Sequence, residues 1–195
     1  MGSGQDKLTD LSDEELIYKV RTEDSESYAE IVRRYQRGLY RFLRYLTNDP
    51  HAAEDLLQDV FIKTYRNLYG FDIKRKFSSW IYRIAHNEGI NYVKKSSRRK
   101  SISWEDAGVP VMSNHDSPTD KLIKEEMQKR LRKYVSELKP KYREPLILHY
   151  FEDKSYQEIS DILRIPIGTV GTLISRGKAV LKAVCEEKGG EPGDE

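Results

Sequence analysis

Aromatic and cationic side chains alternate in one segment of the chain, KRKFSSWIYRIAHNEGINYVKKSSRRK, between Lys74 and Lys100. Strand separation in DNA needs this combination, because aromatic rings stack on extruded bases while cations neutralise phosphates. The pattern therefore indicates binding to unpaired nucleic acid. An alternative stays open, since Trp80 with Ile84 could be core and the cations could form a solvated charge cluster. The residues concerned are Phe77, Trp80, Tyr82, Lys94, Lys95, Arg98, Arg99 and Lys100.

A second segment, SYQEISDILRIPIGTVGTLISRGKAVLK, predicts two short helices around a tight break. Ser155 and Glu158 have the spacing of a capping box, and Pro166 suits the first turn of the next helix. Spacing by three and four predicts an inner face of Ile167, Val170, Ile174, Gly177 and Leu181. The outer positions are small or polar, which fits a helix lying in the major groove of DNA. A generic helical hairpin is the alternative.

No constellation for catalysis or metal binding is found in the sequence. The four histidines are scattered, and no phosphate loop, nucleophile elbow or zinc-protease motif occurs. Cys185 is the single cysteine, which excludes an internal disulfide and a cysteine metal cluster within one chain. We therefore expect no enzyme, no metal and no cofactor.

Composition favours small helical units with polar surfaces. Apolar residues make up 37% of the 195 residues and charged residues 34%. No run approaches the roughly 18 apolar residues of a membrane span, and the start has no apolar signal segment. We expect a soluble, cytoplasmic protein without direct membrane insertion.

The net charge of +2 conceals two basic blocks. Residues 24–100 hold 16 Lys and Arg against 9 Asp and Glu, and residues 124–184 hold 13 against 8. Acidic segments precede, separate and follow them. This alternation predicts two modules that face a polyanion.

Helical periodicity predicts an all-α chain of two small domains. Residues 11–95 follow a helical pattern that is broken at Asn48-Asp49-Pro50, with Asp49 as a helix N-cap. Residues 101–117 lack a period and predict a flexible linker, after which a helix begins at Pro118. The predicted division is a tail with the start of the first helix at 1–23, domains at 24–100 and 118–184, and an acidic tail at 185–195.

Three segments in this order resemble the extracytoplasmic-function (ECF) sigma factors of bacterial RNA polymerase. AAEDLLQDVFIKTYRNLYGFD resembles the core-binding segment, FSSWIYRIAHNEGINYVKKSSRR the promoter-melting segment, and the helix-turn-helix the minus-thirty-five reader. The resemblance implies a sigma-2-like and a sigma-4-like domain in a non-catalytic initiation factor. Two alternatives are a helix-turn-helix regulator that acts without polymerase core, and an adaptor that binds only proteins.

The resemblance also implies roles for particular residues. Contacts to the clamp helices of the largest polymerase subunit are expected from Asp55, Leu56, Gln58, Asp59 and Phe61. Minus-ten DNA is expected to contact Trp80, Arg83, Asn87, Lys94, Lys95, Arg98 and Arg99, with Asn87 holding an unstacked base. Minus-thirty-five DNA is expected to contact Thr169, Gly171, Thr172, Ser175, Arg176 and Lys178.

The family further implies partners and shows where this sequence departs from it. The expected partners are polymerase core, through the clamp helices and the flap, promoter DNA, and an anti-sigma factor that could hold the chain at the membrane. Arg164 stands where the family often has glycine in the turn, and Gly171 and Leu173 replace its usual cations. Pro145 falls inside a predicted helix, which it could kink.

Overall fold

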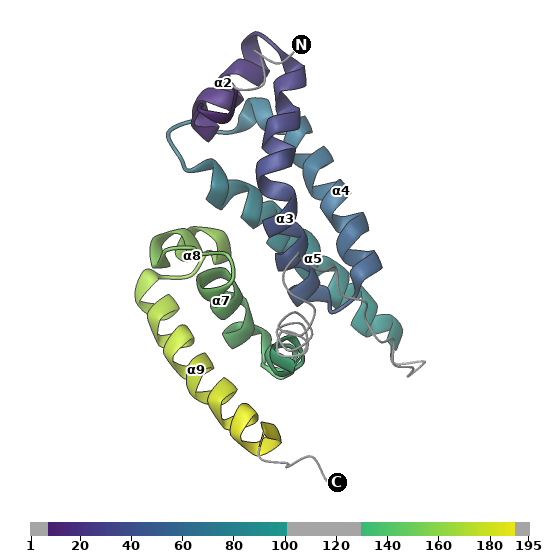
Figure 1. The fold of residues 1–195 in the computed structure, drawn as a ribbon, viewed down its shortest axis with the longest axis vertical. Coiled ribbons are helices and arrows are strands. Elements are labelled where there is room, and N and C mark those ends of the chain that lie inside the picture. Colours follow the sequence, from purple (N-terminus) through teal and green to yellow (C-terminus); the bar gives the residue numbers. More distant parts are fainter. Residues whose placement is uncertain (1–7, 101–129, 190–195) are drawn as a thin grey trace, which may run out of the picture. The chain divides into compact units, whose positions relative to one another are not determined.

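The computed structural model describes residues 8–100 and 130–189, apart from the side chains of residues 97–100. Every regular element in these ranges is helical, which confirms the predicted all-α class (Figure 1). The chain divides into two compact units, built from α2–α5 and from α7–α9. The linker predicted at residues 101–117 and the helix start at Pro118 lie outside the described ranges. The elements are α2 (Asp13–Thr22), η1 (Ser25–Ser27), α3 (Tyr28–Thr47), α4 (Pro50–Arg66), η2 (Leu68–Gly70), α5 (Phe77–Lys100), α7 (Pro140–Tyr150), α8 (Tyr156–Leu163) and α9 (Ile167–Gly189).

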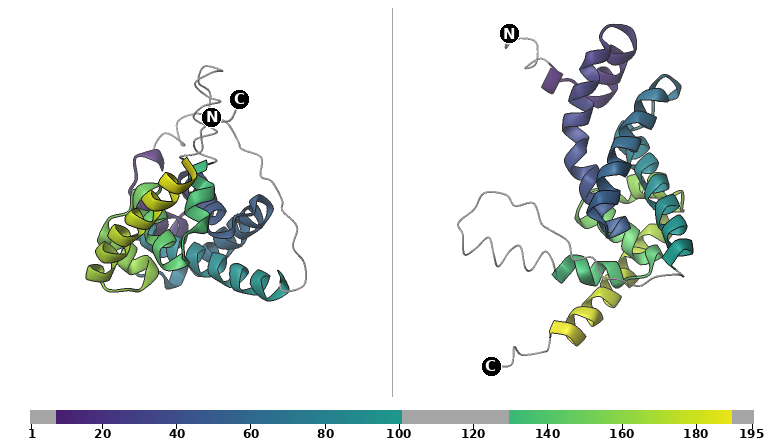
Figure 2. Two further views of the ribbon diagram at one scale, coloured as in Figure 1. Left: turned by 90° about the horizontal axis from the view of Figure 1, so that it is seen from below. Right: turned by 90° about the vertical axis from the view of Figure 1, so that its right-hand side faces the viewer.

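Helices α3 and α4 pack side by side in the first unit (Figure 2). Asn48 ends α3 with a φ of 55°, in the left-handed region that asparagine tolerates. Asp49 caps α4 by accepting a hydrogen bond from the Ala52 N–H at 3.1 Å, and Pro50 takes the first helical position. The predicted helix break is therefore confirmed.

The helical period predicts that the inner stripe of α4 holds Leu56, Val60, Phe61 and Tyr65 or near neighbours of these residues. Leu56 and Val60 are buried and Phe61 is half-buried, whereas 46% of Tyr65 is exposed and its neighbour Thr64 is buried. The buried residues Leu56, Val60 and Thr64 are spaced by four and lie on one face of α4. Tyr65 is the next residue after Thr64, so it projects from the side of this face and not into the core. Its ring packs edge-on against Tyr28, with centroids 5.0 Å apart.

Helix α2 belongs to the first unit, which thus begins before residue 24. A Ser12–Glu15 capping box starts the helix, and Leu16, Ile17 and Val20 contribute to the core. Arg34 of α3 joins this helix to α2, since it donates to Asp13 at 2.9 Å, and it also donates to Glu30 of its own helix at 2.9 Å. A domain boundary at residue 23, as expected from the sequence, would therefore cut α2 off from the unit to whose core it contributes.

A short connection leads from α4 to α5 through η2 and residues 71–76. Phe71 and Phe77, at the two ends of this loop, are 4% and 0% exposed. Both rings pack against Trp80 in the first turn of α5, at centroid distances of 4.9 and 5.6 Å. This aromatic cluster fixes where α5 starts.

In the second unit α7 packs against α9 (Figure 1). Gly177 of α9 is buried, and a Cβ there would lie 2.8 Å from Leu146 Cδ1 and 3.3 Å from Tyr142 Cβ. The predicted inward position of Gly177 is therefore confirmed, and its lack of a side chain permits the close approach of α7. Helix α7 continues through Pro145, which is buried.

The turn between α8 and α9 has the predicted helix-turn-helix chemistry. Glu158 and Ser155 form the expected capping box, with the Ser155 N–H donating to the Glu158 carboxylate at 3.0 Å and the Glu158 N–H to Ser155 Oγ at 3.3 Å. Arg164 has a φ of 56°, so a side chain occupies a left-handed position that glycine would adopt without strain. The Ser160 hydroxyl donates to the Ile165 carbonyl at 2.6 Å and closes the turn.

Candidate nucleic-acid interface

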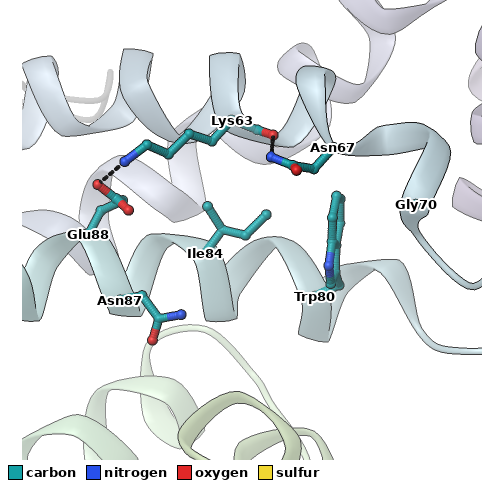
Figure 3. A pocket seen from close by; sticks show the side chains of 7 residues that line it. All are labelled: Lys63, Asn67, Gly70, Trp80, Ile84, Asn87 and Glu88. Atoms are coloured by element: carbon teal, nitrogen blue, oxygen red, sulfur yellow. Dashed lines mark hydrogen bonds and ion pairs between the residues drawn. The ribbon is translucent and has the colours of Figure 1, made fainter.

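A pocket of about 390 Å³ lies between the end of α4, η2 and the first half of α5 (Figure 3). The side chains of Trp80, Ile84 and Glu88 point from α5 toward α4, while Asn87 lies at the edge and turns away from α4. The seven lining residues are Lys63, Asn67, Gly70, Trp80, Ile84, Asn87 and Glu88. An aromatic ring, an aliphatic wall and several hydrogen-bonding groups suit a flat, polar-edged ligand such as a nucleobase.

The polar wall of this pocket is held by hydrogen bonds within the unit. Lys63 pairs with the Glu88 carboxylate across the opening between α4 and α5. The Asn67 amide donates to the Lys63 carbonyl at 2.8 Å and so fixes its own orientation. Asn87 is exposed, and its amide carries both a donor and an acceptor.

Four of the residues predicted to contact minus-ten DNA share one helical face of α5. Trp80, Arg83, Asn87 and Lys94 are spaced by three, four and seven, which brings them to one helical face. Trp80 and Arg83 are half-buried, whereas Lys94 and Lys95 are exposed. Trp80 and Asn87 both line the pocket, and Lys94 follows further along the same helical face. The side chains of Arg98 and Arg99 lie outside the described residues.

Sequence reasoning missed the residues that complete this face. Asn91 is exposed between Asn87 and Lys94, and the lining of the pocket adds Lys63 of α4 and Asn67, which caps the end of α4. Asn91 could have been found, because it is four residues after Asn87 and three before Lys94. The contributions of α4 depend on how two helices pack, for which no local sequence pattern exists.

Helix α4 presents an acidic face that is followed by an exposed apolar residue. Asp55, Gln58 and Asp59, three of the predicted polymerase contacts, are exposed on the same side. Ile62, four residues after Gln58, is 49% exposed on this face and was not predicted.

The two apolar members of the predicted polymerase contacts are less accessible. Leu56 is only 8% exposed and belongs to the core of the unit, so we withdraw it from the contact set. It points inward because it lies on the stripe that continues through Val60 and Thr64. Phe61 is half-buried.

Helix α9 presents the predicted minus-thirty-five residues on its outer side. Thr169, Thr172, Ser175, Arg176 and Lys178 are exposed. The Thr172 hydroxyl donates to the Gly168 carbonyl at 3.1 Å, and the Lys178 ammonium lies 5.8 Å from the centre of the Tyr150 ring. The outer face is therefore hydroxyl-rich, with Arg176 as its central cation.

Two details of α9 differ from the sequence-based expectation. Ile167 was expected to face inward but is 49% exposed, because it is the first residue of the helix and precedes the packed stripe. Gly171 is half-buried, and a Cβ there would lie 3.4 Å from the Tyr156 ring. A side chain at position 171 would therefore start in contact with Tyr156 of α8.

The described residues contain no group of three or more His, Cys, Asp or Glu placed to hold a metal ion. Within the same ranges, no helix is long and apolar enough to cross a membrane.

Comparison with known proteins identifies the family. Residues 31–99 match the family model Sigma-70 region 2, and residues 128–181 match Sigma-70, region 4. The chain is 34% identical over 173 residues to ECF RNA polymerase sigma factor SigW of Bacillus subtilis (strain 168), covering 85% of this chain and 92% of that protein. The chain belongs to the ECF sigma factor family.

Further similarities agree with this ECF assignment. Over 155 residues the chain is 34% identical to ECF RNA polymerase sigma factor SigM of the same organism, covering 80% of this chain and 93% of that protein. A crystallised sigma factor RpoE, bound to the anti-sigma factor NepR from Bartonella quintana, shares the fold with a TM-score of 0.70 and 21% identity, over 83% of this chain and 98% of that one.

The function of this ECF sigma factor is promoter-specific initiation of transcription with RNA polymerase. The alternative of a helix-turn-helix regulator without polymerase core is not favoured, because the region 2 match covers most of the first unit.

Proposed function

We propose that this sigma factor divides its task among three helices. The outer face of α4 binds polymerase core, α5 with its pocket binds the melted minus-ten strand, and the outer face of α9 reads the minus-thirty-five duplex. The observation that carries the proposal is the pocket beside α5, which Trp80 and Asn87 line, with the exposed cations Lys94 and Lys95 further along the same helix.

In the pocket, an unstacked base would lie against Trp80 and Ile84 and bond through its edge to Asn87. Stacking on an aromatic ring contributes roughly 1–3 kcal/mol per base. Lys94 and Lys95, about two helical turns beyond Asn87 on α5, would hold the phosphates of the same strand. No reaction is proposed, since sigma factors in general act without catalysis.

On α4, the exposed acids Asp55 and Asp59 would meet a basic partner surface and Ile62 would be buried by it. Charge complementarity of this kind selects the partner, while burial of the apolar Ile62 side chain supplies affinity. We place the partner surface on the clamp helices of the largest polymerase subunit, with the flap as the partner of the second unit.

We extend the proposal to an anti-sigma factor, as seen for the RpoE–NepR complex, and to a cytoplasmic location with the polymerase. An anti-sigma factor that covers the α4 or α9 face would block polymerase or promoter. Tethering at the membrane would then be a property of that partner.

A reconstitution with core polymerase tests this function. Run-off transcription over a genomic fragment library is expected to give specific starts only when the protein is added. Asp59→Arg is expected to weaken core binding by at least about tenfold, because a like charge then faces the basic surface, while its thermal unfolding stays at the wild-type temperature.

Glu187→Arg serves as the matched control, since it makes the same change of charge at an exposed position of α9. It is expected to bind core as the wild type does. A wild-type protein that neither binds core nor directs specific starts would refute the proposed function, and equal binding by Asp59→Arg would remove α4 from it.

A further inference from the structure

Helix α2 precedes the region 2 match, which begins at residue 31, and no role has been assigned to it so far. Two of its side chains reach the loop of residues 71–76, which lies about 50 residues further along the chain. The Arg21 guanidinium donates from Nη2 to the Phe71 carbonyl at 2.6 Å and also to the Leu68 carbonyl. Glu14 Oε1 accepts the hydrogen bond of the Phe77 N–H at 3.2 Å.

These contacts hold the two ends of the same loop. Arg21 holds the start, where η2 ends, and its guanidinium lies 6.0 Å from the centre of the Phe71 ring. The Tyr69 hydroxyl returns a hydrogen bond to the Arg21 carbonyl at 3.2 Å. Glu14 holds the end, where it satisfies a free N–H in the first turn of α5 and complements the helix dipole.

The ends of this loop are also the supports of the pocket. Phe71 and Phe77 both pack against Trp80, and Gly70, just before Phe71, lines the pocket itself. A shift of either end would therefore move the ring on which a base would stack. Binding sites gain affinity when such groups are held before the ligand arrives, because ordering them then costs no further free energy.

We propose that Arg21 and Glu14 are positioning residues that hold the loop of residues 71–76, and with it Trp80, in the conformation that accepts an unpaired base. This inference rests on the proposed function of the pocket. It assigns to α2 a part in minus-ten recognition that requires no contact between α2 and DNA.

Two variants remove the contacts. Arg21→Met keeps the apolar stem of the side chain and loses the guanidinium that makes both hydrogen bonds to the loop. Glu14→Ala loses the carboxylate that accepts the hydrogen bond of the Phe77 N–H. Both are made with Trp104→Phe, so that Trp80 is the single tryptophan and reports its own surroundings. The probe is the short non-template strand of the promoter found in the run-off assay.

Each variant is expected to bind this strand about tenfold more weakly than the wild type. In the absence of DNA, the fluorescence emission of Trp80 is expected to shift, and the amide hydrogens of residues 71–77 are expected to exchange faster. Binding to minus-thirty-five duplex and to polymerase core is expected to stay unchanged. A general loss of stability would instead weaken all three kinds of binding together.

Lys19→Met is the matched control, because Lys19 lies on the same helix and pairs at 2.8 Å with Glu23 rather than with the loop. Arg21→Lys, which keeps one cation within reach of the carbonyls, is expected to recover part of the strand binding. If Arg21→Met or Glu14→Ala fails to fold, Arg21→Lys and Glu14→Gln replace them. The loss of strand binding, the emission shift and the faster amide exchange are then expected to be smaller but in the same direction.

Wild-type strand binding and Trp80 emission in these variants would overturn the inference. The proposed function of the pocket itself would fail on a different result. In that case the wild-type protein and Asn87→Ala would bind the strand equally, and the fluorescence of Trp80 would not change when the strand is added. Amide exchange in the free variants would in that case still decide whether α2 holds the loop.

Discussion

At Gly177, α9 approaches α7 so closely that a single added carbon has no room. A Cβ would lie 2.8 Å from Leu146 Cδ1 and 3.2 Å from Leu146 Cγ, and Leu146 is itself only 2% exposed. Gly177→Ala is therefore expected to destabilise the protein. Overpacking costs typically 1–3 kcal/mol, and the better helix propensity of alanine returns about 1 kcal/mol. Urea unfolding measures the net loss, which we expect to be up to about 2 kcal/mol.

Gly168 provides the control for this substitution in the same helix. A Cβ at Gly168 would meet nothing within 4 Å, so Gly168→Ala is expected to leave stability unchanged or to raise it by up to about 1 kcal/mol. Equal effects of the two substitutions would show that helix propensity, rather than the contact with α7, decides the outcome.

Arg176 is the central cation of the outer face of α9, and its contribution to promoter selection is testable by itself. Arg176→Ala is expected to weaken binding to the minus-thirty-five duplex by about 1–3 kcal/mol if the guanidinium reads a base edge. Competition among duplexes of altered sequence gives the measurement, with Lys182→Ala, further along the same helix, as control. A loss that is uniform over all sequences would assign Arg176 to a phosphate.

At the scale of elements, an ionic network joins α2 to α3. Arg34 donates to Asp13 of α2 and to Glu30 of α3 at 2.9 Å each, and Arg33 donates to Glu30 at 2.6 and 2.7 Å. The hydrogen bonds from Arg33 and Arg34 lower the pKa of the Glu30 carboxyl from 4.5 to about 2. A lowered pKa stabilises the folded state above the unfolded-state pKa, and this contribution is lost as the pH falls through the folded-state value.

Glu30→Gln is therefore expected to be less stable than the wild type at pH 7, by about 1 kcal/mol or more, and to lose less stability between pH 4.5 and pH 2. Thermal unfolding across this window measures both effects. Glu26→Gln, at an exposed position just before α3, is the control. Parallel pH curves for the wild type and Glu30→Gln would contradict the assigned role of the network.

Local sequence rules predicted the helix ends well and the contacts between helices poorly. Capping boxes, Asp49 and Pro50 depend on neighbours within four residues, so their spacing is visible in the sequence. The bonds of Arg21 and Glu14 to the loop join residues about 50 to 63 positions apart, and no local spacing encodes them. Trp80 and Asn87, which line the pocket beside α5, were singled out from the sequence, while Lys63 and Asn67 became visible as lining residues only when α4 was placed beside α5.

At the scale of the whole molecule, the charge distribution supplies affinity that no single contact explains. The described part of the first basic block carries exposed cations on α5, among them Lys94 and Lys95, on the helix that we propose binds the promoter strand. Each phosphate that a cation neutralises releases counterions, which lowers the slope of log affinity against log salt by about 0.7 for single strands.

The double substitution Lys94→Gln and Lys95→Gln is expected to make that slope shallower by about 1.4, because two phosphate contacts are lost. Fluorescence anisotropy of the promoter strand over a series of salt concentrations measures it. The control is Lys182→Gln with Lys188→Gln, which removes the same charge from α9, where Glu186 and Glu137 pair with these lysines. If both doubles change the slope equally, net charge determines strand affinity; a change confined to the first pair locates the strand along α5.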